Sequence, residues 1–330
     1  MAHVQTVLGP VAPQELKRVL THEHLMSLVT GPWLSGGLRD ERVELAVGAL
    51  SGLPDLGFGT VVDLTPYEIL GRDVPALVEI SRRTGLHVVA ASSIYLEPYA
   101  PSWALEASLD ELTERLVCDA TEGVEDTGVK IGIYGEQATG LGAISSQEEK
   151  FFRAAARAHR RTGLALNTHT THGTMALEQI AILREEGADL SRVVIGHMDI
   201  QPDLDYVREV LASGVNIAFD TLGKQFWDFV LEPPSANPPA GESAKRAYHR
   251  PDSIRLDEIV QLVREGYADR IVMSLDLTGK ETHDNPTTQG RDGYSFIGAQ
   301  VVPRLAELGV PPEALEQMLV TTPARLLTID

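Results

Sequence analysis

The sequence predicts a (β/α)8 barrel, in which eight parallel strands close into a cylinder covered by helices. Short, nearly continuous apolar runs alternate with longer segments whose apolar residues recur at helical spacing, as in a parallel sheet covered by helices. The chain contains eight such runs, which favours the closed TIM barrel over an open doubly wound sheet. The alternation continues along the whole chain, so we expect a single domain over residues 1–330.

The first half of the chain contains four of the predicted strands. They lie at 19–25, 60–64, 87–94 and 129–134. Three predicted helices separate them, at 41–56, 75–84 and 105–123. The segment at about 25–40 contains Gly31-Pro32 and Gly36-Gly37, and it is too long and too rich in breakers for a tight connection. We therefore expect a long loop there, at the rim of an active site.

The second half repeats the same unit. The remaining strands are predicted at 164–168, 192–195, 215–219 and 270–275. Helices are predicted at 147–162, 174–186, 204–212 and 256–265, and again after Tyr294. The region at about 221–253 interrupts the rhythm, because it contains five prolines among aromatic and basic residues. It is expected to form a second long loop.

The composition narrows the classes of partner. Lys and Arg number 28 and Asp and Glu number 47, so the formal net charge is −19. Nucleic acid and anionic membrane surfaces are therefore not expected as partners, since both would be repelled. The single Cys118 excludes an internal disulfide, and no run approaches the length of a membrane span. A soluble cytoplasmic protein is expected.

Five side chains that can bind a metal ion lie where predicted strands end. His22 and His24 are two residues apart, so in a strand both point to the same face. His169, His197 and Asp276 each close another apolar run. Two neighbouring histidines alone are more often surface or core residues, but catalytic groups of (β/α)8 barrels gather at the carboxyl ends of the strands. The five coincidences together predict a metal centre.

The number of ligands indicates two metal ions. Five protein ligands exceed the three or four that one zinc ion usually takes, and two ions favour a bridging carboxylate. Glu136, after the fourth predicted strand, is the candidate, with a solvated loop carboxylate as the alternative. A carbamylated Lys130 is disfavoured as the bridge, because six strand residues would place it roughly 20 Å away.

With these residues the chain resembles the phosphotriesterase family of the amidohydrolase superfamily, over nearly its whole length. The matching motifs are Thr-His22-Glu-His24-Leu, Thr-His169-Thr, Gly-His197-Met-Asp199 and Ser-Leu-Asp276. Within the family it is most similar to the phosphotriesterase homology proteins, on the segments Lys130-Ile-Gly-Ile-Tyr-Gly-Glu136 and Phe219-Asp-Thr-Leu-Gly-Lys224. Thr221 stands where classical organophosphate hydrolases carry a histidine, and Glu136 where they carry a carbamylated lysine. Proficient triester hydrolysis is therefore not expected.

The resemblance implies a binuclear metal-dependent hydrolase. By it, His22, His24 and Asp276 hold the buried ion, His169 and His197 hold the exposed ion, and Glu136 bridges both with a hydroxide. Metal binding lowers the pKa of water to about 7, which supplies the nucleophile, and Asp276 is the natural acceptor of its proton. Zinc is expected, with manganese or cobalt as alternatives.

The expected reaction is attack on the carbonyl of a lactone, carboxylic ester or amide. A phosphotriesterase (aryldialkylphosphatase) is the alternative activity, and a non-catalytic metal-bound barrel that binds a ligand is the alternative of another class. Members of the family often form homodimers, which the sequence neither supports nor excludes.

Substrate selection is expected to depend on the loops. Cationic and aromatic residues there predict a small anionic substrate, with solvated surface residues as the alternative. The candidate anchors are Arg246, Tyr248, Arg250, Arg291 and Tyr294. His172 either lines the pocket or begins a surface helix. Asp199 either orients an imidazole or is a solvated carboxylate at a helix start.

Overall fold

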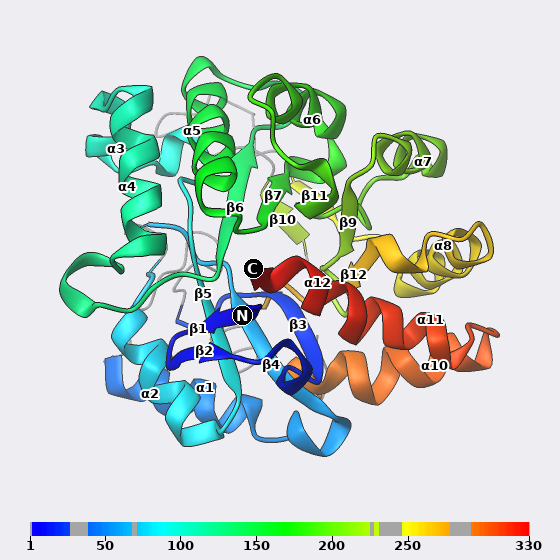
Figure 1. Ribbon diagram of the computed structural model, residues 1–330. Coiled ribbons are helices and arrows are strands. Elements are labelled where there is room, and N and C mark those ends of the chain that lie inside the picture. The colour runs from blue at the N-terminus through cyan, green and yellow to red at the C-terminus, as the bar shows by residue number, and fades with distance from the viewer. Residues whose placement is uncertain are drawn as a thin grey trace, which may run out of the picture.

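The computed structural model of the protein describes residues 2–26, 39–67, 71–224, 228–230, 246–277 and 292–329, with the backbone alone for 228–230 and 246–248. Eight parallel strands form one sheet that curves into a barrel (Figure 1). In the order in which they pair, beginning at the seam, they are β3 (Arg18–Glu23), β4 (Phe58–Asp63), β5 (His87–Ser92), β6 (Ile133–Thr139), β7 (Leu166–Thr170), β8 (Val193–Ile195), β9 (Asn216–Phe219) and β12 (Ile271–Met273). The predicted (β/α)8 barrel is confirmed.

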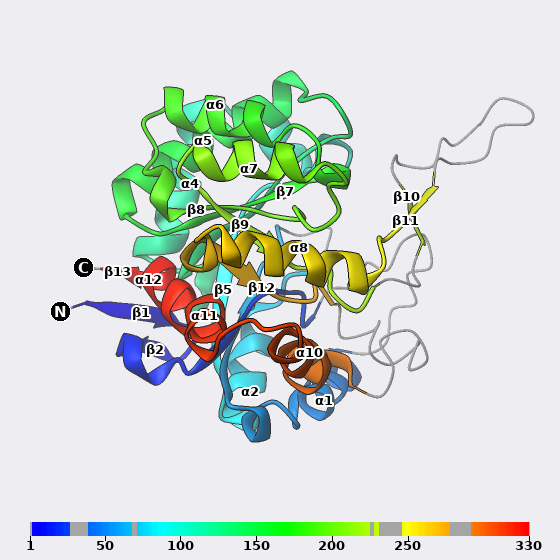
Figure 2. The ribbon, with the colours of Figure 1, turned by 90° about the vertical axis from the view of Figure 1, so that its right-hand side faces the viewer.

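The helices pack around the outside of the barrel (Figures 1 and 2). They are α1 (Arg39–Leu50), α2 (Val74–Thr84), α3 (Ser102–Glu106), α4 (Leu109–Thr121), α5 (Ser146–Thr162), α6 (Ala176–Glu185), α7 (Leu204–Ala212), α8 (Asp252–Arg264), α10 (Val302–Glu307), α11 (Pro312–Glu316) and α12 (Thr322–Leu327). The prediction of one continuous helix at 105–123 is wrong, because two helices lie in this region. The short helix α3 ends at Glu106, and α4 begins at Leu109. Ser108 starts the new helix, because its hydroxyl accepts the Glu111 N–H and the Glu111 carboxylate accepts the Ser108 N–H.

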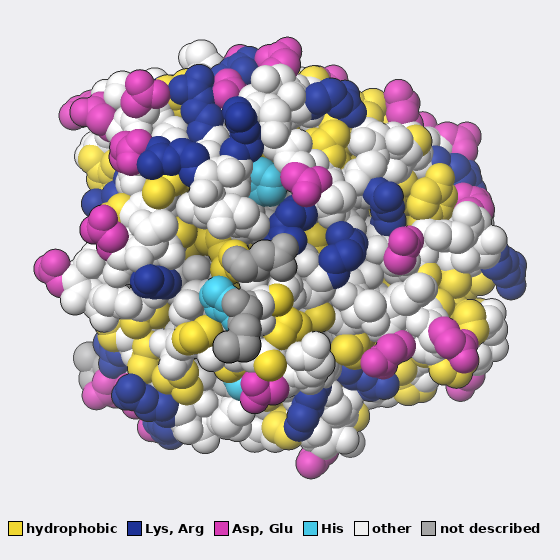
Figure 3. Space-filling model, in the orientation of Figure 1, with side chains coloured by type: hydrophobic (Ala, Val, Ile, Leu, Met, Phe, Trp, Pro, Cys, Tyr) yellow, Lys and Arg dark blue, Asp and Glu magenta, His cyan; other side chains and the backbone are white. Residues whose placement is uncertain are grey.

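One end of the barrel is filled with apolar side chains. A buried cluster includes Val62, Val89, Val194, Ala218 and Val272, one residue from each of five strands. The antiparallel strands β1 (His3–Thr6), β2 (Gly9–Val11) and β13 (Thr328–Ile329) lie at this end, with both chain termini (Figure 2). Figure 3 shows this face, over which side chains of both charges are spread. The opposite end, where the parallel strands finish, holds the imidazoles and carboxylates that were predicted to bind metal ions.

The first and last strands meet at a seam that a side chain helps to close. The carboxylate of Glu23, fully buried in β3, accepts hydrogen bonds from Ser274 Oγ at 2.7 Å and from the N–H groups of Leu275 and Leu277 at 3.0 and 2.8 Å. The His24 N–H donates to the Leu277 carbonyl at 2.9 Å. These hydrogen bonds join the segment that carries His22 and His24 to the segment that carries Asp276.

The fourth barrel strand differs from its prediction. It was expected at 129–134, but β6 spans Ile133–Thr139, because its polar second half is satisfied inside the barrel. Gln137, for example, donates to the Ile94 carbonyl at 2.6 Å. Glu136 consequently lies within the strand and is 4% exposed, so the alternative of a solvated loop carboxylate is wrong. Lys130 is exposed and precedes the strand, at its amino end.

The two predicted long loops are only partly described. Within 25–40, residues 27–38 lie outside the described residues, and α1 begins at Arg39. Within 221–253 the backbone forms an antiparallel pair of short strands, β10 (Asp228–Val230) and β11 (Arg246–Tyr248). No helix in the described part of the chain is both long and apolar enough to cross a membrane.

Candidate metal centre

The six predicted metal ligands come together at the carboxyl end of the barrel. His22 and Glu136 lie in β3 and β6, and His169 lies in β7. His24 directly follows β3, while His197 and Asp276 lie shortly after the ends of β8 and β12. Two overlapping groups offer ligand atoms within 4.8 Å of one another: His22, Glu136 and His197, and His22, His24 and Asp276. The second group is the set that the resemblance implied for the buried ion.

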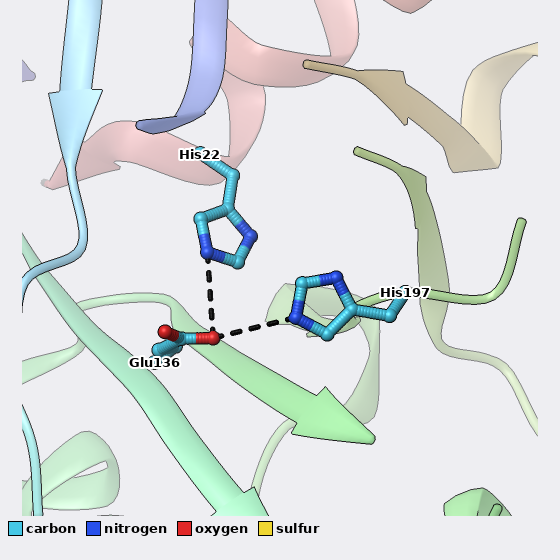
Figure 4. A group of neighbouring side chains, drawn as sticks. All are labelled: His22, Glu136 and His197. Carbon is cyan, nitrogen blue, oxygen red and sulfur yellow. Dashed lines mark ion pairs between the residues drawn. The ribbon is translucent and has the colours of Figure 1, made fainter. Parts of the chain in front are cut away.

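The Glu136 carboxylate faces the imidazoles of His22 and His197 (Figure 4). Its Oε2 atom is 3.4 Å from His22 Nε2, 3.5 Å from His197 Nε2 and 2.9 Å from His169 Nδ1. Its Oε1 atom is 3.3 Å from His24 Nε2. Burial by itself raises the pKa of the Glu136 carboxyl, but the facing imidazoles hold it well below its usual range. One carboxylate therefore contacts all four imidazoles.

Asp220 orients two of the imidazoles. This fully buried carboxylate follows β9 and accepts from His22 Nδ1 at 2.7 Å and from His197 Nδ1 at 2.9 Å. Because an ionised carboxylate only accepts, both rings carry a proton on Nδ1 and turn Nε2 toward the centre. Sequence reasoning assigned Asp220 no role. The signal was present, since Asp220 ends an apolar run just as Asp276 does.

The nitrogen and oxygen atoms that point into the centre are suited to binding divalent cations. His22 Nε2 is buried and makes no hydrogen bond, and it faces Glu136 Oε2 and, at 3.7 Å, Asp276 Oδ1. A lone pair directed at carboxylate oxygens is repulsive unless a proton or a metal ion lies between them. Burial alone lowers the pKa of His22, but the charges of Glu136 and Asp220 raise it to about 9. The same atoms that attract this proton are nitrogen and oxygen ligands suited to zinc and similar ions.

Hydroxyl groups orient the other two imidazoles. His24 Nδ1 lies 3.1 Å from Thr65 Oγ1. The Tyr95 hydroxyl lies 3.3 Å from His169 Nδ1, and Thr171 Oγ1 lies 3.3 Å from His169 Nε2. None of these hydroxyls was singled out from the sequence, because Thr and Tyr near a strand end are common in any barrel.

Asp276 is held in place from two sides. Lys224 Nζ contacts Asp276 Oδ2 at 2.7 Å, while Oδ1 lies 3.0 Å from His24 Nε2. Burial by itself raises the pKa of Asp276, but the charge of Lys224, followed by the imidazoles, keeps it well below its usual value. The backbone of Asp276 and His197 is left-handed, with φ of 52° and 58°. Such conformations are unfavourable for non-glycine residues and occur where a site imposes them.

Asp199 plays neither of the roles considered for it. It is fully buried, and its Oδ2 atom accepts from Thr221 Oγ1 at 2.7 Å and from Arg255 at 2.8 Å. Arg255 is itself buried and also donates to the Thr221 carbonyl at 2.7 Å. Asp199 and Arg255 thus fix the backbone that follows Asp220.

The residues predicted to anchor the substrate lie in different environments. Arg250 donates to Glu258 at 2.5 and 2.9 Å, and to the Gln201 carbonyl at 2.7 Å. Tyr294 is fully buried, and its hydroxyl donates to the Leu277 carbonyl at 3.2 Å. His172 is partly buried, with φ of 55°, in the turn after β7. Arg291 and the side chains of Arg246 and Tyr248 lie outside the described residues. The anchoring roles stay predictions.

The fold and the centre define a class of protein, the parallel barrels that bind metal ions at the carboxyl ends of their strands. The model of the phosphotriesterase family matches residues 2–327, and the chain belongs to this family. A solved structure of the phosphotriesterase homology protein from Escherichia coli, complexed with phosphate in its active site, superposes with a TM-score of 0.81. It is 28% identical and covers 95% of this chain and 99% of its own.

Two further relatives differ in their described activities. A structure described as molecular engineering of organophosphate hydrolysis activity from a weak promiscuous lactonase template is 32% identical, with a TM-score of 0.82, over 98% of this chain and 99% of its own. The N-acetyltaurine hydrolase of Dictyostelium discoideum is 29% identical over 92% of this chain and 80% of its own. The comparisons confirm the predicted family and identify the chain as a metal-dependent hydrolase that acts on small molecules.

Proposed function

We propose that this chain is a binuclear hydrolase that cleaves a lactone, carboxylic ester or amide of a small anionic substrate. The observation that carries the proposal is the position of Glu136, whose carboxylate contacts His22, His24, His169 and His197. A carboxylate among four imidazoles is the arrangement that two neighbouring cations need for a shared ligand. His22, His24 and Asp276 would hold one ion, His169 and His197 the other, and zinc is the proposed metal, with manganese or cobalt as alternatives.

When bound, two divalent cations would supply a hydroxide nucleophile near neutral pH and polarise the bond under attack. The protein's part is to place proton acceptors and charges around them. Asp276 turns Oδ1 toward the centre, while its Oδ2 contacts Lys224. Because each carboxylate oxygen has two acceptor sites, Asp276 can hold an ion and also accept the nucleophile's proton. Lys224, which is 7% exposed, also offsets the charge of Asp276, so the carboxylates of the centre repel an anionic substrate less.

The choice of a carbonyl substrate has two supports. One relative is described through a lactonase template and another as an N-acetyltaurine hydrolase, and both descriptions refer to acyl chemistry. In addition, Thr221, which stands in the place of the histidine of classical organophosphate hydrolases, is bound to Asp199 and Arg255. A phosphotriesterase remains the second candidate, because organophosphate hydrolysis was engineered from the lactonase template.

The test is a substrate panel with defined metal content. The zinc, manganese and cobalt forms are assayed against lactones, esters, amides and organophosphates, with Asp276→Asn as the control for catalysis by contaminants. We expect turnover of one carbonyl class that Asp276→Asn abolishes. A higher kcat/KM on organophosphates would favour the phosphotriesterase. No turnover of any class with both metals bound would favour a barrel that only binds a ligand.

A further inference from the structure

Asp220 connects the two proposed cation sites without belonging to either. Its Oδ2 atom accepts from His22, a ligand of the buried ion, and its Oδ1 atom accepts from His197, a ligand of the exposed ion. The backbone N–H of His197 also donates to Oδ1, at 2.9 Å. The ring centroids of His22 and His197 are 5.1 Å apart. One carboxylate is thus shared between imidazoles from different sites.

The carboxylate cannot follow one imidazole without losing the other. Both of its oxygens are engaged, and the backbone that follows it is anchored, because the Thr221 N–H donates to Asp199 at 3.1 Å and the Thr221 carbonyl accepts from Arg255. Asp220 therefore acts as a fixed reference for both rings. Each ring keeps the tautomer in which Nδ1 donates and Nε2 is left for a metal ion.

We propose that Asp220 is a positioning residue shared by both cation sites, so that loss of its charge weakens two sites at once. This inference rests on the binuclear function proposed above. An asparagine amide makes the argument testable, since it offers one acceptor oxygen and one donor nitrogen. It can serve one imidazole as the aspartate does. The other imidazole then faces an N–H group, accepts through Nδ1, carries its proton on Nε2 and is lost as a ligand in that tautomer.

The experiment measures metal binding and needs no substrate. Metal-free wild type and Asp220→Asn are titrated with zinc by calorimetry, and the manganese forms are examined by electron paramagnetic resonance. We expect two zinc ions per wild-type chain and one per Asp220→Asn chain. The affinity for the remaining ion should fall about tenfold or more, because the single amide oxygen is divided between two imidazoles. The manganese wild type should show a spin-coupled pair and the variant the spectrum of a single ion. Asp119→Asn is the matched control, because this buried carboxylate accepts from Tyr67 and Ser92 and from no ligand.

A second variant separates sharing from simple destabilisation. In a His197→Ala background only His22 needs an acceptor, and the asparagine oxygen can provide it. Asp220→Asn should then cost the buried site no more than about threefold in affinity, less than in the presence of His197. An equal loss in both backgrounds would overturn the sharing.

The outcomes distinguish the two proposals. Two ions with unchanged affinity in Asp220→Asn would overturn the role of Asp220 and leave the binuclear function intact. Fewer than two ions in the wild type would overturn the binuclear function itself. If the metal-free variant does not fold, native mass spectrometry of protein purified in zinc gives the same count, and two bound zinc ions would again contradict the inference.

Discussion

The four imidazoles of the centre fall into two pairs that are supported differently. His22 and His197 donate to a buried carboxylate at 2.7 and 2.9 Å. His24 and His169 lie 3.1 Å or more from hydroxyl groups, which can rotate and can either donate or accept. The first pair therefore has a set tautomer and a set orientation, while the second pair can adjust.

The difference follows the exposure of the pairs. The side chain of His22 is fully buried, whereas that of His169 is 15% exposed and is approached by Tyr95 from the loop after β5. Charge-assisted hydrogen bonds are stronger than neutral ones, so the carboxylate holds the more buried pair, His22 and His197, more firmly. The adjustable pair is the more exposed one, with His24 at 8% and His169 at 15%. Three substitutions and a change of pH test this difference between the two pairs of imidazoles.

The largest effect is expected from Glu136→Gln, because Glu136 contacts both pairs. The glutamine keeps the shape but removes the charge that balances two divalent ions, so at least one ion and nearly all turnover should be lost, at least about a thousandfold in kcat. Elemental analysis and steady-state kinetics measure both. Lys130→Met is the control and should retain two ions, since Lys130 is exposed at the opposite end of β6. Bicarbonate-dependent recovery of activity, with a metal-free Lys130→Met and a loaded Glu136→Gln, would instead indicate a carbamylated lysine.

The second prediction concerns pH. In the metal-free protein, burial lowers the pKa of His22, but Glu136 and Asp220 outweigh it and raise the pKa to about 9. The pKa of His169 shifts in the other direction, because burial and the charge of His197 lower it. A pKa above the unfolded value of 6.5 adds stability that is complete below 6.5 and is lost as the pH rises through about 9. Metal ions must displace this proton.

The metal-free protein should therefore melt at a lower temperature at pH 9 than at pH 6.5. Apparent zinc affinity should change in the other direction and rise with pH over the same range, with protons released on binding. Thermal melts and calorimetry in buffers of different ionisation enthalpy check both. A melting temperature of the metal-free protein that rises from pH 6.5 to pH 9 would contradict the raised pKa.

The third change, Thr65→Val, tests the adjustable pair. It removes the hydroxyl beside His24 Nδ1 and should weaken only the buried ion, by about tenfold, at the lower end of effects seen for residues that orient ligands. Zinc titration measures it. Thr113→Val is the matched control, because this buried hydroxyl donates to the Leu109 carbonyl in α4. Loss of both ions would mean that the two pairs do not differ in the way described.

The smallest effect is expected from Tyr95→Phe. The Tyr95 hydroxyl lies 3.3 Å from His169, a long and neutral contact, so both ions should stay bound. Removing one such hydrogen bond should change kcat/KM by less than about tenfold. Tyr134→Phe, whose hydroxyl donates to the Leu116 carbonyl, is the control for loss of a buried hydroxyl elsewhere. Loss of a metal ion in Tyr95→Phe would place Tyr95 among the groups that hold His169 rigidly.

Sequence alone was sufficient for the barrel and for the set of side chains that meets at its carboxyl end. Buried parallel strands appear in the sequence as apolar runs, and in this barrel all of them finish at the same end. Residues that follow the runs therefore meet at that end, however far apart they lie in the sequence. His22, His169, His197 and Asp276 were found in this way, and Glu136 followed from the need for a bridging carboxylate.

The tertiary structure alone decided which groups orient these ligands. Asp220 contacts His22 across 198 residues of chain, and Glu23 joins Leu277 across 254. Local apolar periodicity carries no information about such pairs, because a polar side chain at a strand end looks the same whether it binds a metal ion, a histidine or water. The same reason explains why the bounds of β6 and the burial of Asp199 with Arg255 were not foreseen. Their polar atoms are satisfied by partners that only the closed barrel brings within reach.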